Sequence, residues 1–204
     1  MSDKFRNRYR IQSIRLQKWD YGWNGAYFVT ICTKNRIAYF GFVKKRKMYL
    51  SEIGKIVQKY WNEIPNHFPF VRLDAFVVMP NHVHGIIIID KNDGDIVGTQ
   101  NADTHNAVET QDFASLQQWQ QRGDQTNDNE IHRNKFGPQS QNLASIVRGY
   151  KIGVTKNARM LNPDFGWQRL YYDHIIRDRW SYETIHDYII ANPENWHGDR
   201  FYRN

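Results

Sequence analysis

A chain of 204 residues is long enough for one domain with a sizeable core, and its 28 Lys and Arg against 21 Asp and Glu give a net charge of +7. This charge, with 15% aromatic residues, suits a partner that carries phosphates and stackable bases, although an ordinary basic protein has the same composition. The single cysteine excludes an internal disulfide framework and a cysteine-based zinc site, and because neither a membrane span nor a signal peptide is visible we expect a cytoplasmic protein.

The beginning of the chain is basic and leads into a strand. Residues 1–20 predict a basic arm in which Arg10 and Arg15 are candidates for phosphate contact, and a solvated tail is the alternative. Ala26–Thr33 is rich in β-branched and aromatic residues and therefore predicts the first strand.

A hairpin and a helix are expected next. Gly41–Tyr49 predicts a short hairpin, and Lys45 and Arg46 in its basic run are candidates for contact with a nucleic-acid backbone. An ordinary solvated loop is the alternative. Ser51–Trp61 has apolar residues at helical spacing behind a serine that can cap a helix, so it predicts a helix.

Two histidines open the most apolar stretch of the chain. Val71–Met79 and His82–Asp90 predict two strands joined at a Pro-Asn turn. His82 and His84 are two residues apart, so their side chains point to the same face of the predicted sheet. Two neighbouring imidazoles can hold a metal ion. The alternative is a pair of histidines that bond to solvent or backbone.

Residues 91–140 differ from the rest of the chain. They contain 8 Gln and 6 Asn, and their 8 acidic and 4 basic residues make the remaining chain more basic than the net charge suggests. A polar segment without periodicity cannot bury enough apolar surface to offset its ordering entropy. We therefore expect a flexible insertion, with a short helix near Phe113–Gln121 and no assigned function.

The chain regains its periodicity after the insertion. Leu143–Met160 predicts a helix, on which Arg148, Lys151 and Lys156 are candidates for lining the path of a nucleic-acid strand. Tyr171–Arg177 predicts the last strand.

A final helix is predicted over Ser181–Asn192, and Pro193 ends it. Tyr188 and Asn192 are four residues apart and share a face of this helix. A tyrosine is a possible covalent nucleophile, and an amide oxygen is a suitable ligand for a hard cation. On the residues alone, a core tyrosine and a helix-terminal asparagine are the better interpretation, since eleven other tyrosines compete.

The order of the predicted elements is β-α-β-β-insertion-α-β-α, in a single domain over residues 1–204. This order predicts an α+β fold of the ferredoxin-like or RRM-like class. We expect a split βαβ antiparallel sheet with helices on one face, plus an added C-terminal helix that carries Tyr188.

Several motifs together resemble one family, the single-tyrosine HUH transposases, and within it the REP-associated tyrosine transposase branch. The similarity covers residues 10–90 and 141–196. The motifs that carry it are Tyr27–Thr30, Val78–His84, Trp167-Gln168, Tyr172–Arg177 and Tyr188-Ile189 followed by Asn192-Pro193.

The resemblance implies a nuclease that nicks single-stranded DNA beside a hairpin or palindrome, such as a REP element, and transfers the strand. His82, His84 and Asn192 would hold Mg²⁺ or Mn²⁺, and Tyr188 would form a 5′-phosphotyrosine link. Such an enzyme would work in the cytoplasm at the nucleoid, as a monomer or a homodimer.

Two other functions stay open at this point. One is a non-catalytic module that binds single-stranded nucleic acid on a ferredoxin-like sheet. The other is a metal-dependent hydrolase that uses activated water. The transposase hypothesis has a geometric requirement, because the last helix must lie across the sheet face that bears His82 and His84.

Overall fold

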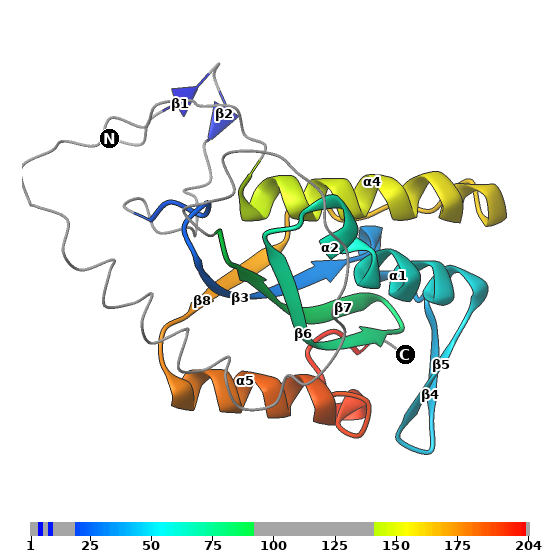
Figure 1. The fold of residues 1–204 in the computed structure, drawn as a ribbon. Coiled ribbons are helices and arrows are strands. Elements are labelled where there is room, and N and C mark those ends of the chain that lie inside the picture. Colours follow the sequence, from blue (N-terminus) through cyan, green and yellow to red (C-terminus); the bar gives the residue numbers. More distant parts are fainter. Residues whose placement is uncertain (1–3, 6–7, 10–18, 92–140, 203–204) are drawn as a thin grey trace, which may run out of the picture.

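The computed structural model describes residues 4–5, 8–9, 19–91 and 141–202 (Figure 1). The predicted basic arm falls mostly outside these residues, as do Arg10, Arg15 and the expected helix near Phe113–Gln121. Two short strands of the arm are described, β1 (Lys4–Phe5) and β2 (Arg8–Tyr9), and they pair with each other. In the described part of the chain, no helix has the length and apolar character that a bilayer span needs.

A four-stranded antiparallel sheet forms the centre of the fold. Its strands are β3 (Gly25–Cys32), β6 (Val71–Met79), β7 (His82–Ile89) and β8 (Tyr172–Ile176), in the order β6-β7-β3-β8. The first and third strands in chain order are therefore central, as in a split βαβ unit. The predicted α+β fold class is confirmed.

Three helices cover one face of this sheet (Figure 1). They are α1 (Glu52–Asn62), α2 (Ile64–His67) and α4 (Leu143–Leu161). The predicted cap of α1 is present, because the Ser51 hydroxyl accepts a hydrogen bond from the backbone N–H of Gly54 at 3.0 Å. The buried side chains of the three helices form one large core with the odd-numbered apolar residues of β7.

A glycine in β7 is required by this packing. A Cβ atom on Gly85 would come within 2.3 Å of the Trp61 ring, which stacks on Phe76 with 4.4 Å between ring centres. Only glycine leaves room for the indole, so the residue after His84 is set by the helix face of the sheet.

Helix α5 lies on the opposite face of the sheet, as Figure 1 shows. Helix α5 (Arg179–Ala191) contacts β6 and β7, and its Ile189 is buried against Ile86. It begins two residues earlier than predicted, because the Asp178 carboxylate accepts a hydrogen bond from the backbone N–H of Ser181 at 2.7 Å and caps the helix there.

Two smaller features complete the described fold. The predicted hairpin consists of β4 (Gly41–Lys44) and β5 (Lys47–Leu50), and it projects beyond the β6 side of the sheet (Figure 1). After α5, the chain turns through a short 3₁₀ helix, η2 (Trp196–Gly198), and returns to the sheet. Trp196 and Phe201 of this segment are buried against Met79.

Candidate metal and tyrosine site

His82 and His84 lie side by side on the sheet face that α5 covers. Their Nε2 atoms are 3.0 Å apart, and their side chains are 0% and 1% exposed. The alternation of side chains along β7 produces this pairing, since Val83 and Gly85 face the helices on the other side of the sheet. The predicted histidine pair is therefore present as a buried, preformed pair of nitrogen atoms.

The hydrogen bonds of Asn81 determine the tautomer of His82. The Nδ1 atom of His82 lies 2.8 Å from Oδ1 of Asn81. The amide of Asn81 is oriented by its Nδ2, which donates to the carbonyl oxygens of Phe201 at 2.9 Å and Arg36 at 3.2 Å. Because its oxygen must then face the ring, Nδ1 carries the proton, and the lone pair that a metal ion needs is on Nε2, which contacts Nε2 of His84.

His84 has a more adaptable partner. Its Nδ1 lies 2.9 Å from the hydroxyl oxygen of Thr30, the residue opposite it on β3. A hydroxyl group can donate or accept, so it tolerates either tautomer of this imidazole. The ring also stacks on Phe28, with 5.3 Å between ring centres, which limits its rotation.

Burial keeps both imidazoles neutral at neutral pH. It lowers the pKa of His84 from 6.5 to about 3, and the positive charge of Arg200 adds to this effect. Burial also lowers the pKa of His82 well below its usual value, and the neighbouring His84 contributes. A neutral imidazole is the form that binds metals, so no proton has to be displaced near pH 7.

Helix α5 brings Tyr188 to these histidines. It lies across the sheet face that bears them, as the transposase hypothesis requires. The Tyr188 hydroxyl lies 3.2 Å from Nε2 of His84. A hydrogen bond from the Tyr182 hydroxyl to the Asp74 carboxylate ties the same helix to β6 at a bulge. Burial and the negative charge of Asp199 raise the pKa of Tyr188, whereas a hydrogen bond from Asn192 lowers it. Because the net direction is upward, the phenol is protonated at neutral pH.

The third possible ligand in the histidine cluster is Asp199, which the sequence analysis did not single out. Its carboxylate and the nitrogen atoms of His82 and His84 all lie within 4.8 Å of one another, so this group could hold a metal ion. Asp199 lies just after η2, in a segment without periodicity. Only its short distance along the chain from Tyr188 could have pointed to it.

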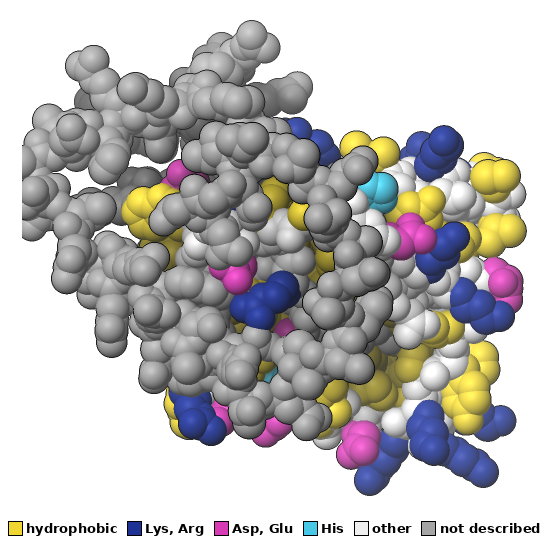
Figure 2. Space-filling view, viewed as in Figure 1, with side chains coloured by type: hydrophobic (Ala, Val, Ile, Leu, Met, Phe, Trp, Pro, Cys, Tyr) yellow, Lys and Arg dark blue, Asp and Glu magenta, His cyan; other side chains and the backbone are white. Residues whose placement is uncertain are grey.

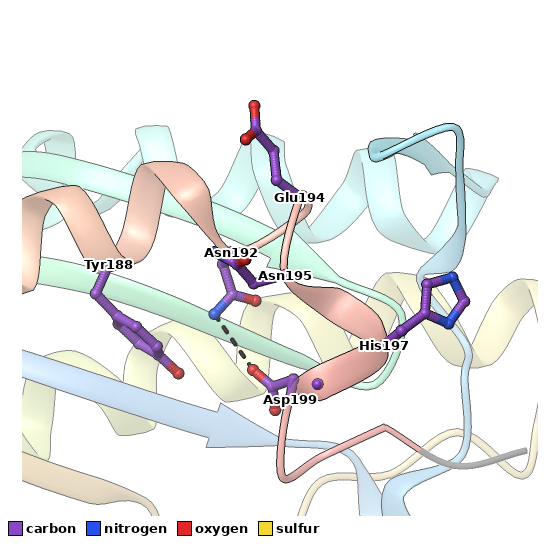
Figure 3. A pocket seen from close by; sticks show the side chains of 7 residues that line it. Tyr188, Asn192, Glu194, Asn195, His197 and Asp199 are labelled. Carbon is purple, nitrogen blue, oxygen red and sulfur yellow. Dashed lines mark hydrogen bonds between the residues drawn. The ribbon is translucent and has the colours of Figure 1, made fainter.

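Asn192, the ligand expected from the resemblance, lies next to this group. Its Nδ2 donates to Oδ2 of Asp199 at 3.3 Å (Figure 3). Its Oδ1 is buried and has no hydrogen-bond partner among the described residues. An orphaned buried oxygen is unfavourable unless a cation or water satisfies it. The two imidazole nitrogens and the carboxylate of Asp199 fit a divalent metal ion, and the unpaired amide oxygen of Asn192 is a hard donor beside them.

An open cavity of about 510 Å³ adjoins the tyrosine. Figure 3 shows that Tyr188 and Asn192 point from α5 toward the C-terminal segment, whereas Glu194 and His197 point away. A substrate can therefore reach the phenol from solvent. The residues that line the cavity are Tyr188, Asn192, Glu194, Asn195, His197, Gly198 and Asp199.

The basic residues predicted to contact DNA are spread over the molecule. Lys45 and Arg46 are exposed at the turn of the β4–β5 hairpin, with φ of 50° and 62°. Arg148 and Lys156 are exposed on α4, on the opposite side of the sheet from the histidines. Lys151 of the same helix donates to the carbonyl oxygen of Gln168 at 2.9 Å, and burial lowers its pKa to about 8.

Comparison with known proteins gives a family and a fold. No protein-family model matches the chain. The chain is 40% identical over 192 residues to an uncharacterized protein of Haemophilus influenzae, and the match covers 94% of this chain and 92% of that protein. This chain belongs to the family of that Haemophilus protein.

Among solved structures, the fold is similar to that of a REP-associated tyrosine transposase bound to a REP hairpin. The TM-score is 0.53 and the identity 19%, over 92% of this chain and 75% of the other. At this level of identity the likeness establishes the fold.

Proposed function

We propose that this protein is a metal-dependent, single-tyrosine DNA nuclease and strand transferase of the transposase type. One observation carries the proposal: the Tyr188 hydroxyl lies 3.2 Å from a buried imidazole of the cluster formed by His82, His84 and Asp199. A protein that only binds nucleic acid needs neither the buried ligand set nor a tyrosine beside it. The similar fold of a transposase agrees with this assignment.

The chemistry is a phosphoryl transfer in two reversible halves. Oη of Tyr188 attacks the phosphorus of a phosphodiester, the bond from phosphorus to the 3′ oxygen breaks, and the 5′ phosphate stays on the tyrosine. The phenolic proton leaves to water through the open cavity, and the departing 3′ oxygen takes up a proton from water. A 3′ hydroxyl of the same or another strand then reverses the step.

His82, His84 and Asp199, with Oδ1 of Asn192, would hold the divalent cation, Mg²⁺ or Mn²⁺. When bound, the cation supplies charge stabilisation at the phosphate oxygens. Nitrogen ligands suit Mn²⁺ better than Mg²⁺, so we expect the tighter binding with Mn²⁺. Asn81 and Thr30 orient the imidazoles of His82 and His84 through hydrogen bonds to their Nδ1 atoms.

The substrate we propose is single-stranded DNA next to a hairpin, by extension from the structurally similar protein that is bound to a REP hairpin. The β4–β5 hairpin offers a suitable surface. Phe42 and Tyr49 stack on its outer face with 5.4 Å between ring centres and are 58% and 46% exposed. Figure 2 shows Lys and Arg side chains gathered at the lower right, where Figure 1 places this hairpin. Exposed aromatic rings beside cations suit stacked bases and phosphates.

The basic residues Lys45, Arg46, Arg148, Lys151 and Lys156, with Arg10 and Arg15 of the arm, remain proposed DNA contacts. Of these, Lys45 and Arg46 have the strongest support, because they lie at the tip of the hairpin that carries the aromatic pair. Lys151 has the weakest, since its ammonium group is already bonded to a carbonyl oxygen.

A covalent-adduct experiment tests the function. The protein is incubated with Mn²⁺ and end-labelled single-stranded DNA that contains a hairpin, and a labelled band that survives denaturing electrophoresis is sought. We expect this band with the wild type and its loss in Tyr188→Phe. Tyr172→Phe is the matched control, because Tyr172 is 42% exposed and Tyr188 43% exposed.

The other functions give different results in the same experiment. An adduct that persists in Tyr188→Phe means that another residue is the nucleophile. Cleavage without an adduct supports a hydrolase that uses water, and tight binding without cleavage supports a binding module.

A further inference from the structure

Two arginines converge on one phenyl ring beside the candidate metal site. The guanidinium carbons of Arg36 and Arg200 lie 4.8 Å and 4.6 Å from the centre of the Phe201 ring. The centre of this ring is 4.5 Å from that of the His82 imidazole. Two positive charges are therefore held beside the site, in contact with the same buried ring.

Neither arginine forms an ion pair with a carboxylate of the described residues. Across residues 19–91 and 141–202, no carboxylate lies within ion-pair distance of either guanidinium group. The nearby carboxylate of Asp199 instead accepts hydrogen bonds from the backbone N–H of Phe201 at 2.6 Å and from Asn192. Two neighbouring cations repel each other, and a bound anion would relieve the repulsion.

The backbone also holds Arg36 in place. Its Nη1 donates to the carbonyl oxygen of Arg200 at 3.2 Å, which joins the segment after β3 to the C-terminal segment. Its φ of 56° is in the left-handed region, which is rare for residues other than glycine. Strain of this kind is found preferentially at binding sites, where the surrounding structure maintains it.

We propose that Arg36 and Arg200 form a phosphate-binding site for the phosphodiester next to the one that Tyr188 attacks. The identity of this anion rests on the proposed function, whereas the site itself rests on two arginines that share one aromatic ring and form no ion pair among the described residues. A guanidinium group offers several donors in a plane, which match the oxygens of a phosphate. Arg200 also lowers the pKa of Tyr188 and of His84, so its charge acts on the reacting groups.

The test is a binding experiment that requires no cleavage. The affinity of the full chain for fluorescein-labelled oligothymidylate of about 20 nucleotides is measured by anisotropy in EDTA at several salt concentrations. The variants are Arg36→Gln, Arg200→Gln and their combination, and thermal melts check that each one folds. Lys55→Ala is the control, because Lys55 is exposed on α1 and pairs with Glu52 at 2.7 Å.

We expect each arginine variant to bind about three- to tenfold more weakly and to lower the slope of log Kd against log salt by about 0.7. Arg200→Lys, which keeps the charge, should retain most of that slope. If the double variant folds and binds with the affinity and slope of the wild type and of Lys55→Ala, the phosphate site is wrong.

The adduct experiment separates this inference from the proposed function. Normal adduct formation by a double variant with unchanged binding refutes the arginine site and leaves the function standing. If the wild type forms no adduct but the double variant loses salt-dependent binding, the phosphate site stands and the nuclease assignment fails.

Discussion

Acid should destabilise the metal-free protein through His84. The folded-state pKa of this residue is about 3, against 6.5 in an unfolded chain, and its side chain is 1% exposed. Between these two values the unfolded state binds a proton that the folded state does not. The contribution of His84 to the free energy of unfolding is therefore largest above pH 6.5 and declines as the pH falls.

The size of the effect follows from the shift. Each pH unit below 6.5 removes about 1.4 kcal/mol, so lowering the pH to about 5 should remove about 2 kcal/mol through His84 alone. The burial of His82 acts in the same direction. This loss is a large fraction of the stability of an ordinary domain, which is about 5–15 kcal/mol.

Urea unfolding followed by tryptophan fluorescence, in EDTA and across this pH range, measures the loss. We expect His84→Gln to flatten the decline, because glutamine can still bond to Thr30 but does not titrate. His174→Gln is the control, since His174 is an exposed histidine of β8. If the free energy of unfolding of His84→Gln falls as steeply as that of the wild type, the explanation from burial is refuted.

Three further substitutions test the site and its support. Asp199→Asn should weaken Mn²⁺ binding at least about tenfold in calorimetry, whereas Glu194→Gln, which points away from the cluster, should not; equal affinities would exclude Asp199 as a ligand. Asn81→Ala should weaken Mn²⁺ binding by about 10- to 100-fold through loss of the bond to the histidine ring, and an unchanged affinity would show that this bond does not orient the ligand. Gly85→Ala should lower the free energy of unfolding by about 1–3 kcal/mol, because its methyl group would collide with Trp61; a neutral result would mean that the indole can move aside.

The regular elements were predictable because local pattern and tertiary structure agree. The apolar run of β7 is buried on both faces. Helices α1, α2 and α4 cover one face, and α5 and the C-terminal segment cover the other. The helix caps at Ser51 and Asn142 stabilise helix starts that the apolar spacing had already indicated. The start of α5 was missed because Arg179 and Trp180 lie exposed before the apolar spacing begins, so only the Asp178 cap marks it.

The site was predictable only in part, for a different reason. His82, His84 and Tyr188 lie on regular elements, so their faces follow from periodicity once the packing of α5 is known. Asp199 lies in an irregular segment, and its position depends on contacts with residues far away in the chain. One of these contacts is the hydrogen bond from Asn81 to the carbonyl oxygen of Phe201, 120 residues apart.

That long-range bond connects the candidate metal ligands with the C-terminal segment. Asn81 orients His82 through its oxygen and anchors the chain beside Asp199 through its nitrogen. One amide thus positions two candidate ligands from distant parts of the chain. Two imidazoles on an open sheet face would be solvated and free to rotate. Because α5 and the C-terminal segment cover them, the same two residues become a buried, oriented pair of candidate ligands with a tyrosine beside it.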